Sequence, residues 1–190
     1  MKKQVYSTRI ITAANACTLM RILAIPVIMQ TLYEQQWGWA FGLFSAAAIT
    51  DIIDGWIARS FNQQTILGTY LDPIADKLLL FACYASLAFT KLPFAIPTWF
   101  VYFVLGKELL LIVGALFLRL MSQRFIIRPT MLGKYTTFAQ VCFIGWFLMS
   151  AYYQWNCVAA NNLFLAVIVV LMLGTLIDYA HNGYKELSKL

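Results

Sequence analysis

Charge is scarce in this chain of 190 residues, because aspartate, glutamate, lysine and arginine together make up only 12% of it. A soluble domain usually carries about 25% charged residues, so an ordinary water-soluble fold is excluded. Apolar residues make up 62% of the chain, and its mean hydropathy is +0.73. The composition predicts an all-α integral membrane protein with a single domain, residues 1–190.

Cysteine is also sparse and shows no pattern. The four cysteines lie at positions 17, 83, 142 and 157, and no two of them have the CxxC spacing of a zinc or redox site. We interpret them as small core residues rather than disulfides or metal ligands. No array of aromatic and basic residues indicates a nucleic-acid surface, so the net charge of +6 is interpreted as a membrane-topology signal.

Long uncharged runs define the predicted helices. A membrane-spanning helix needs about 20 mostly apolar residues, and the run from Tyr135 to Ile177 contains no charge at all. Turn residues divide the chain into six predicted transmembrane helices, at about 15–33, 37–60, 69–90, 95–119, 133–153 and 159–180. Residues 1–11 are predicted to form a short N-terminal interfacial helix, with a disordered tail as an equal alternative.

Lysine and arginine are distributed unevenly over the predicted loops. Cytoplasmic loops of membrane proteins carry an excess of these cations, so a cytoplasmic N-terminus is predicted. This orientation leaves only Lys91 outside and places both termini in the cytosol. The cations on or near the inner side are then Lys2, Lys3, Arg9, Arg59, Arg119, Arg124, Arg128, Lys134, Lys185 and Lys189.

Only eight residues are acidic, and half of them are concentrated in one segment: Asp51, Asp54, Asp72 and Asp76. A carboxylate in apolar surroundings is costly unless it is paired or binds a metal. The apolar runs beside these aspartates are too short to span a membrane alone, so each helix must include its aspartates. The carboxylates are therefore predicted below the headgroups, in a cavity open to the cytosol.

Helical spacing places these aspartates on two faces. At 100° per residue, Asp51 and Asp54 share one face, and Asp72 and Asp76 share another. Pro73 is acceptable if it lies in or near the first turn of its helix. Two facing helices can bring the four carboxylates to one point, where oxygen ligands suit two Mg²⁺ or Mn²⁺ ions for phosphoryl transfer. A structural or capping role and a cation or proton transporter are the alternatives.

The pattern D-x2-D-G-x2-A-R-x8-G-x3-D-x3-D runs from Asp51 to Asp76 with every fixed position matched. It resembles the signature of the CDP-alcohol phosphatidyltransferase family, and the chain length and six-span layout extend the resemblance over most of the chain. The resemblance implies that Asp51, Asp54 and Asp72 ligate one metal and that Asp76 contacts a second or acts as the catalytic base. It also implies that four residues shape the site for the CDP-lipid, namely Gly55, Ala58, Arg59 and Gly68, and that Thr65 is a further contact.

The first predicted helix opens with a second motif. Asn15, Thr18 and Arg21 form the N-x2-T-x2-R pattern, which resembles the opening of phosphatidylglycerophosphate-synthase-like members of the family. Asn15 and Thr18 are predicted to hydrogen-bond the nucleotide, with helix capping as the alternative. Arg21 either binds a phosphate of the acceptor or extends toward the interface.

If the alcohol that receives the phosphatidyl group itself carries a phosphate, this phosphate needs a binding pocket that contains cations. Lys134, in the run Gly133-Lys134-Tyr135-Thr136-Thr137, is the first candidate, because this run resembles the fifth helix of phosphatidylglycerophosphate synthases. Arg119 and Lys107 are further acceptor candidates, although Arg119 fits a positive-inside anchor and Lys107 fits an ion pair with Glu108. The lysine at position 107 departs from the arginine that these synthases usually carry, and the two residues are not equivalent.

Together with the carboxylates, this resemblance implies an enzyme that transfers a phosphatidyl group from CDP-diacylglycerol to sn-glycerol 3-phosphate, giving phosphatidylglycerophosphate and CMP. The alternative is a cardiolipin synthase with phosphatidylglycerol as the lipid acceptor. The resemblance further implies a homodimer. We expect a multi-pass protein among the lipids of a bacterial cytoplasmic (inner) membrane, with its active site facing the cytosol.

Overall fold

The computed structural model describes residues 13–60, 66–90, 92, 96–121, 130–155 and 157–187. Within these ranges it leaves the side chains of 13–17, 52, 54–60, 66–71, 73, 115–121, 184 and 186–187 undescribed. Six α-helices and no strand make up the described chain, which confirms the all-α prediction. The predicted interfacial helix at 1–11 lies outside the described residues.

The helices follow the predicted spans closely. They are α1 (Ala13–Tyr33), α2 (Trp37–Ser60), α3 (Ile66–Ala88), α4 (Thr98–Met121), α5 (Met131–Tyr152) and α6 (Val158–Leu187). The fourth begins at Thr98, after Pro97, whose carbonyl oxygen accepts a hydrogen bond of 3.0 Å from the N–H of Phe100. The sixth extends past the predicted end at 180, because polar residues end the apolar run without ending the helix.

One expectation about α3 is wrong. Pro73 was expected in or near the first turn, but α3 begins at Ile66 and Pro73 is its eighth residue. Proline has no N–H, so the helix lacks the hydrogen bond that this position would donate to the carbonyl of Thr69. The apolar run alone did not reveal the extra turn.

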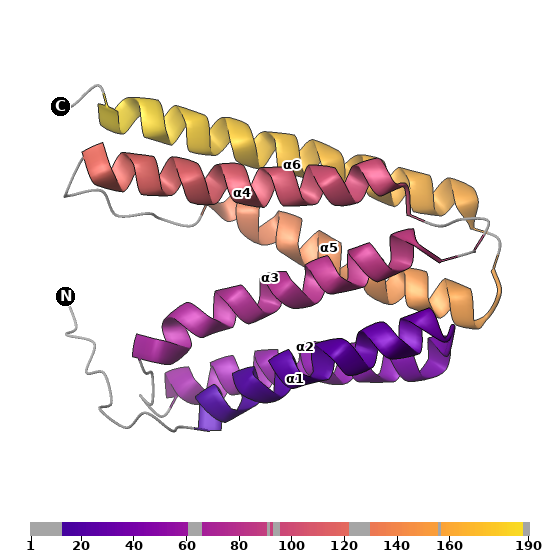
Figure 1. Ribbon diagram of the computed structural model, residues 1–190. Helices are drawn as coiled ribbons and strands as arrows, with labels where there is room; N and C mark the ends of the chain where they lie inside the picture. The colour runs from indigo at the N-terminus through magenta and orange to yellow at the C-terminus, as the bar shows by residue number, and fades with distance from the viewer. Residues whose placement is uncertain are drawn as a thin grey trace.

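The helices run alternately up and down and join in a single bundle (Figure 1). The first three pack together through contacts of α1 with α2 and α3, while α5 packs against α2, α3 and α6, and α4 packs against α3 and α6. Both the start of α1 and the end of α6 lie at the same end of the bundle, on the left of Figure 1. The end of α2 and the start of α3, which carry the aspartate motif, lie at this end too.

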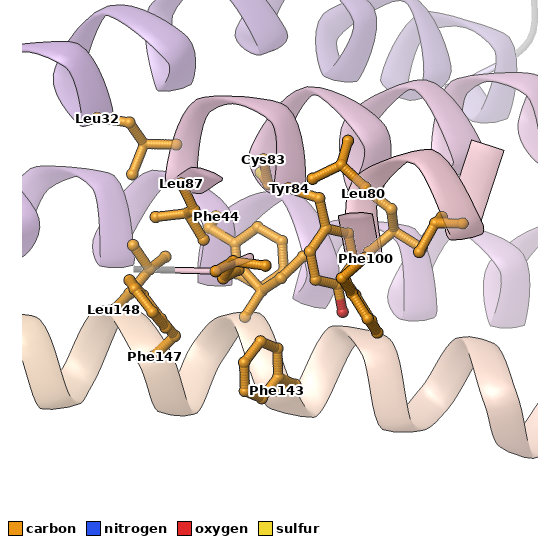
Figure 2. Packing of buried hydrophobic residues seen from close by; sticks show 14 of the residues in the cluster. Leu32, Phe44, Leu80, Cys83, Tyr84, Leu87, Phe100, Phe143, Phe147 and Leu148 are labelled. Atoms are coloured by element: carbon orange, nitrogen blue, oxygen red, sulfur yellow. The ribbon is translucent and has the colours of Figure 1, made fainter. Parts of the chain in front are cut away.

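A hydrophobic core fills the other half of the bundle. Figure 2 shows Phe44, Tyr84, Phe100 and Phe143, which come from four different helices, packed together. The Tyr84 and Phe143 rings stack with centroids 6.2 Å apart, and the Tyr84 hydroxyl donates to the carbonyl of Gln140 at 3.2 Å. This core holds α2, α3, α4 and α5 together and leaves the motif end of the bundle free for polar groups.

We expect Phe143→Ala to lower the free energy of unfolding by about 3 kcal/mol, because a fully buried ring would leave a cavity between three helices. Thermal unfolding in detergent measures the change. The matched control is Phe89→Ala, since the Phe89 side chain is 80% exposed and should change little. Equal losses for the two variants would contradict this view of the core.

Within the described residues, one segment, Val158–Gly183, is long and apolar enough to cross a membrane, and its most apolar 18 residues have a mean hydropathy of 2.4. Thr18–Tyr33 is a shorter apolar helix. Many large apolar side chains on the outer faces are exposed, including Tyr102, Val170 and Ile177. The protein thus has an apolar outside as well as an apolar core.

Candidate functional site

A cavity of about 550 Å³ opens at the motif end of the bundle, and all six helices contribute to its wall. Asp51 from α2 and Asp76 from α3 lie on one part of the wall. Lys107 from α4 and Lys134 from α5 belong to the same wall. One cavity therefore brings together these two carboxylates of the motif and these two cations from outside the motif.

Arg21 of α1 joins the two halves of the aspartate motif. Its Nη2 donates to Asp51 Oδ1 and its Nη1 donates to Asp76 Oδ1, each at 2.5 Å. The Arg21 side chain is only 4% exposed, whereas those of Asp51 and Asp76 are 41% and 39% exposed. The buried guanidinium thus connects two helices at their carboxylates, and its head does not extend toward the interface.

Thr18 lies one turn before Arg21 on the same helix and also contacts a carboxylate of the motif. Its hydroxyl donates to Asp72 Oδ1, and the Thr18 side chain is buried. Residues three apart on a helix share a face, so the N-x2-T-x2-R motif presents both groups to α2 and α3. The structure therefore places Thr18 on a carboxylate of the motif within α3, and not at a helix cap.

Several predicted residues lie where no side chain is described. They are Asn15, Asp54, Gly55, Ala58, Arg59, Gly68 and Arg119, whose backbones belong to helices, while Thr65 lies outside the described residues altogether. Their predicted roles in metal, CDP-lipid or acceptor binding stay predictions. The backbone alone places Asp54 and Arg59 on α2 and Gly68 on α3, beside the described motif residues.

The described carboxylates suit a hard divalent cation by their chemistry. Asp51, Asp72 and Asp76 offer only oxygen donors, which Mg²⁺ and Mn²⁺ prefer. Arg21 is one positive charge among these three carboxylates, so the cluster keeps an excess of negative charge. Among the described side chains, however, no three acidic, histidine or cysteine groups converge closely enough to hold an ion.

A second charged cluster lines the same cavity. Glu108 Oε1 is 2.7 Å from Lys107 Nζ, and Lys77 forms an ion pair with the other oxygen, although that contact lacks the geometry of a hydrogen bond. The Lys107 side chain is 3% exposed, compared with 49% for Lys77. The predicted Lys107–Glu108 pair is present, and it also connects α4 to the residue that follows Asp76.

The start of α5 positions Lys134. The Thr130 hydroxyl caps this helix by accepting from the N–H of Gly133 at 3.1 Å. A Cβ on residue 133 would lie 3.2 Å from that hydroxyl oxygen, so glycine permits the close approach. Lys134 follows in the first turn, lines the cavity, and forms no ion pair with any other residue in the described part of the chain.

Sequence reasoning missed the contribution of α6. Thr175 and Tyr179 line the cavity, and the Thr175 hydroxyl lies 3.0 Å from that of Thr136 on α5. The two α6 residues are four apart and share a face. Two polar groups at this spacing, at the end of the apolar run of α6, were the available signal.

A sequence model described as CDP-alcohol phosphatidyltransferase matches residues 11–177, and the chain belongs to this family. It is 30% identical over 176 residues to the CDP-diacylglycerol–glycerol-3-phosphate 3-phosphatidyltransferase of Aquifex aeolicus, covering 92% of this chain and 97% of that protein. A probable phosphatidylglycerophosphate synthase of Mycobacterium tuberculosis is 29% identical over 95% of this chain and 85% of its own length. Human cardiolipin synthase (CMP-forming) is 35% identical over 65% of this chain, but this match covers only 40% of the human protein.

Proposed function

We propose that this protein transfers the phosphatidyl group of CDP-diacylglycerol to sn-glycerol 3-phosphate, with release of CMP. The observation that carries the proposal is one cavity whose wall contains Asp51 and Asp76 of the motif together with a separate set of cations. Similarity to the Aquifex aeolicus enzyme over nearly the full length of both chains supports the choice of acceptor. Family membership favours this transfer over ion transport.

The acidic part of the cavity is proposed to bind the CDP-lipid. Asp51, Asp54, Asp72 and Asp76 would hold one or two Mg²⁺ or Mn²⁺ ions, whose chemistry is to offset the charge of the pyrophosphate. Asp76 is proposed to accept the proton of the attacking hydroxyl. Asn15 and Thr18 are proposed to contact the nucleotide, together with the motif residues Gly55, Ala58, Arg59, Thr65 and Gly68.

The cationic part is proposed to bind the phosphate of the acceptor. Lys134 lies in the first turn of α5, where the helix dipole also favours an anion. Lys107 lines the same cavity, although Glu108 already pairs with it. Arg119 and Arg21 are the remaining acceptor candidates.

The proposed setting is a bacterial cytoplasmic membrane, with six spans and the cavity facing the cytosol. Two observations support this topology. The outer faces of the helices expose apolar side chains, and the start of α1 lies at the same end of the bundle as the end of α6 (Figure 1). A homodimer is proposed from the family resemblance. Its interface would use part of the same apolar outer surface.

The test is CMP release from CDP-diacylglycerol by the purified protein with Mg²⁺ or Mn²⁺. Glycerol 3-phosphate and phosphatidylglycerol are compared as acceptors, each against a reaction without acceptor. We expect release that depends on glycerol 3-phosphate. Release that depends only on phosphatidylglycerol would instead establish the cardiolipin synthase alternative, and the absence of release with every acceptor would contradict the proposed transfer.

Lys134→Gln is expected to raise the KM for glycerol 3-phosphate by about 10-fold to 100-fold, because it removes one hydrogen bond to a charged group. The kcat should fall much less, because the change removes binding of the acceptor and leaves the carboxylates in place. Lys185→Gln, a lysine outside the cavity wall in the last turn of α6, is the matched control. An unchanged KM for Lys134→Gln would show that another cation binds the phosphate.

A further inference from the structure

Arg21 has the contacts of an internal counter-ion. Its guanidinium donates to one oxygen of Asp51 and one oxygen of Asp76, on two different helices, with 2.5 Å for each contact. The side chain is almost completely buried, so water cannot replace either contact at low cost. An arginine is always charged and presents its donors in a rigid planar fork, which suits a permanent bridge between two carboxylates.

The same two carboxylates would hold the proposed divalent cation. A carboxylate oxygen engaged by a guanidinium at 2.5 Å has its negative charge already partly neutralised. Two cations held by the same carboxylates also repel each other, and the buried guanidinium is only weakly screened by water. Metal binding at Asp51 and Asp76 must therefore displace the guanidinium or be weakened by it.

We propose that Arg21 is a positioning residue that holds Asp51 and Asp76 together and competes with the divalent cation for their carboxylates. This inference rests on the proposed metal role of the motif. Arg21 stabilises the motif before the cation binds and lowers the affinity of the motif for that cation. A guanidinium released from the carboxylates remains at the cavity wall, where a phosphate of the substrate can accept its hydrogen bonds.

Thr18 completes this arrangement on α1. Its hydroxyl holds Asp72 one turn away from the Arg21 contacts, but a hydroxyl carries no charge and does not repel a cation. The competition is therefore specific to Arg21. In contrast, Lys107 is an equally buried cation of the same cavity whose partner is Glu108, outside the motif.

The experiment measures Mn²⁺ binding to the purified full chain in detergent by titration calorimetry, for wild type, Arg21→Gln, Arg21→Lys and Lys107→Gln. We expect Arg21→Gln to bind Mn²⁺ at least about tenfold more tightly than wild type, because one repelling charge is removed from the ligands. Arg21→Lys should fall between the two, because lysine keeps the charge and cannot donate in a fork to two carboxylates. Lys107→Gln should bind Mn²⁺ nearly as wild type does.

Thermal unfolding of the same samples supplies a second readout. Without added metal, Arg21→Gln should unfold at a lower temperature than wild type, and saturating Mn²⁺ should raise its unfolding temperature by more than it raises that of wild type. A residue with only a structural role would lower stability without tightening metal binding. If Arg21→Gln does not fold, Arg21→Lys carries the same comparison with a smaller expected difference.

The outcomes separate this inference from the proposed function. Equal or weaker Mn²⁺ binding by both Arg21 variants, with normal binding by wild type, would overturn the competition and leave the metal role intact. No Mn²⁺ binding by wild type would overturn the metal role and the competition together. The CMP-release assay tests the transfer reaction independently of both results.

Discussion

Asp76→Asn is expected to lower the rate of acceptor-dependent CMP release by about 100-fold to 10,000-fold, the usual contribution of a general base. Asparagine keeps the size of the side chain but cannot accept the proton of the attacking hydroxyl. The Asp76 side chain is 39% exposed and lines the cavity, so the proposed acceptor can reach it. The purified variant is assayed with CDP-diacylglycerol, glycerol 3-phosphate and Mg²⁺ or Mn²⁺.

Asp178→Asn provides the matched control for this substitution. Asp178 is a half-buried residue of α6 that lies outside the motif and outside the cavity wall. Its variant should retain a rate close to that of wild type. The Mn²⁺ affinity of Asp76→Asn separates its two proposed roles: an unchanged affinity indicates a lost proton acceptor, and a weaker affinity indicates a lost metal ligand. A rate near that of wild type for Asp76→Asn would contradict the role of proton acceptor.

Glu108→Gln should lower the free energy of unfolding by about 3 kcal/mol or more, because it removes one partner of a buried ion pair. Lys107 would keep its charge with a side chain only 3% exposed. Lys77 would lose its partner as well, but it is half exposed and water can replace that contact. Thermal unfolding in detergent measures the loss.

A second substitution checks the physical cause. Adding Lys107→Met to Glu108→Gln should restore much of the lost stability, because the double variant no longer buries an unpaired charge. Glu34→Gln, an exposed glutamate in the turn after α1, is the matched control and should have little effect. If the double variant is less stable than Glu108→Gln alone, the unpaired charge is not the cause.

Helix content and most helix ends were predictable from the sequence because they depend on local patterns. Uncharged runs bounded by turn residues identified six segments, and the structure has a helix at each of them. The start of α3 was predicted at about residue 69 but lies at Ile66, because the helix continues for three residues before the predicted span without a long apolar run to reveal them. The cavity at the motif end was also predictable, since the charged residues gather there.

The partners inside the site were less predictable, since they join distant parts of the chain. Two roles were predicted for Arg21, phosphate binding or extension toward the interface. The bridge that it forms between Asp51 and Asp76 was not predicted. The Lys107–Glu108 pair was foreseen because the two residues are adjacent. The contact of Glu108 with Lys77 joins different helices and was not foreseen.

The sequence by itself determined the class of this protein, its helices and the group of aspartates that marks its family, because composition and helical periodicity are local properties of the chain. Only the tertiary structure decided which charges meet. The contacts of Arg21 span 30 and 55 residues and depend on how α1 packs against α2 and α3. The rotation and register of packed helices arise from many side-chain contacts at once, and no single motif encodes them.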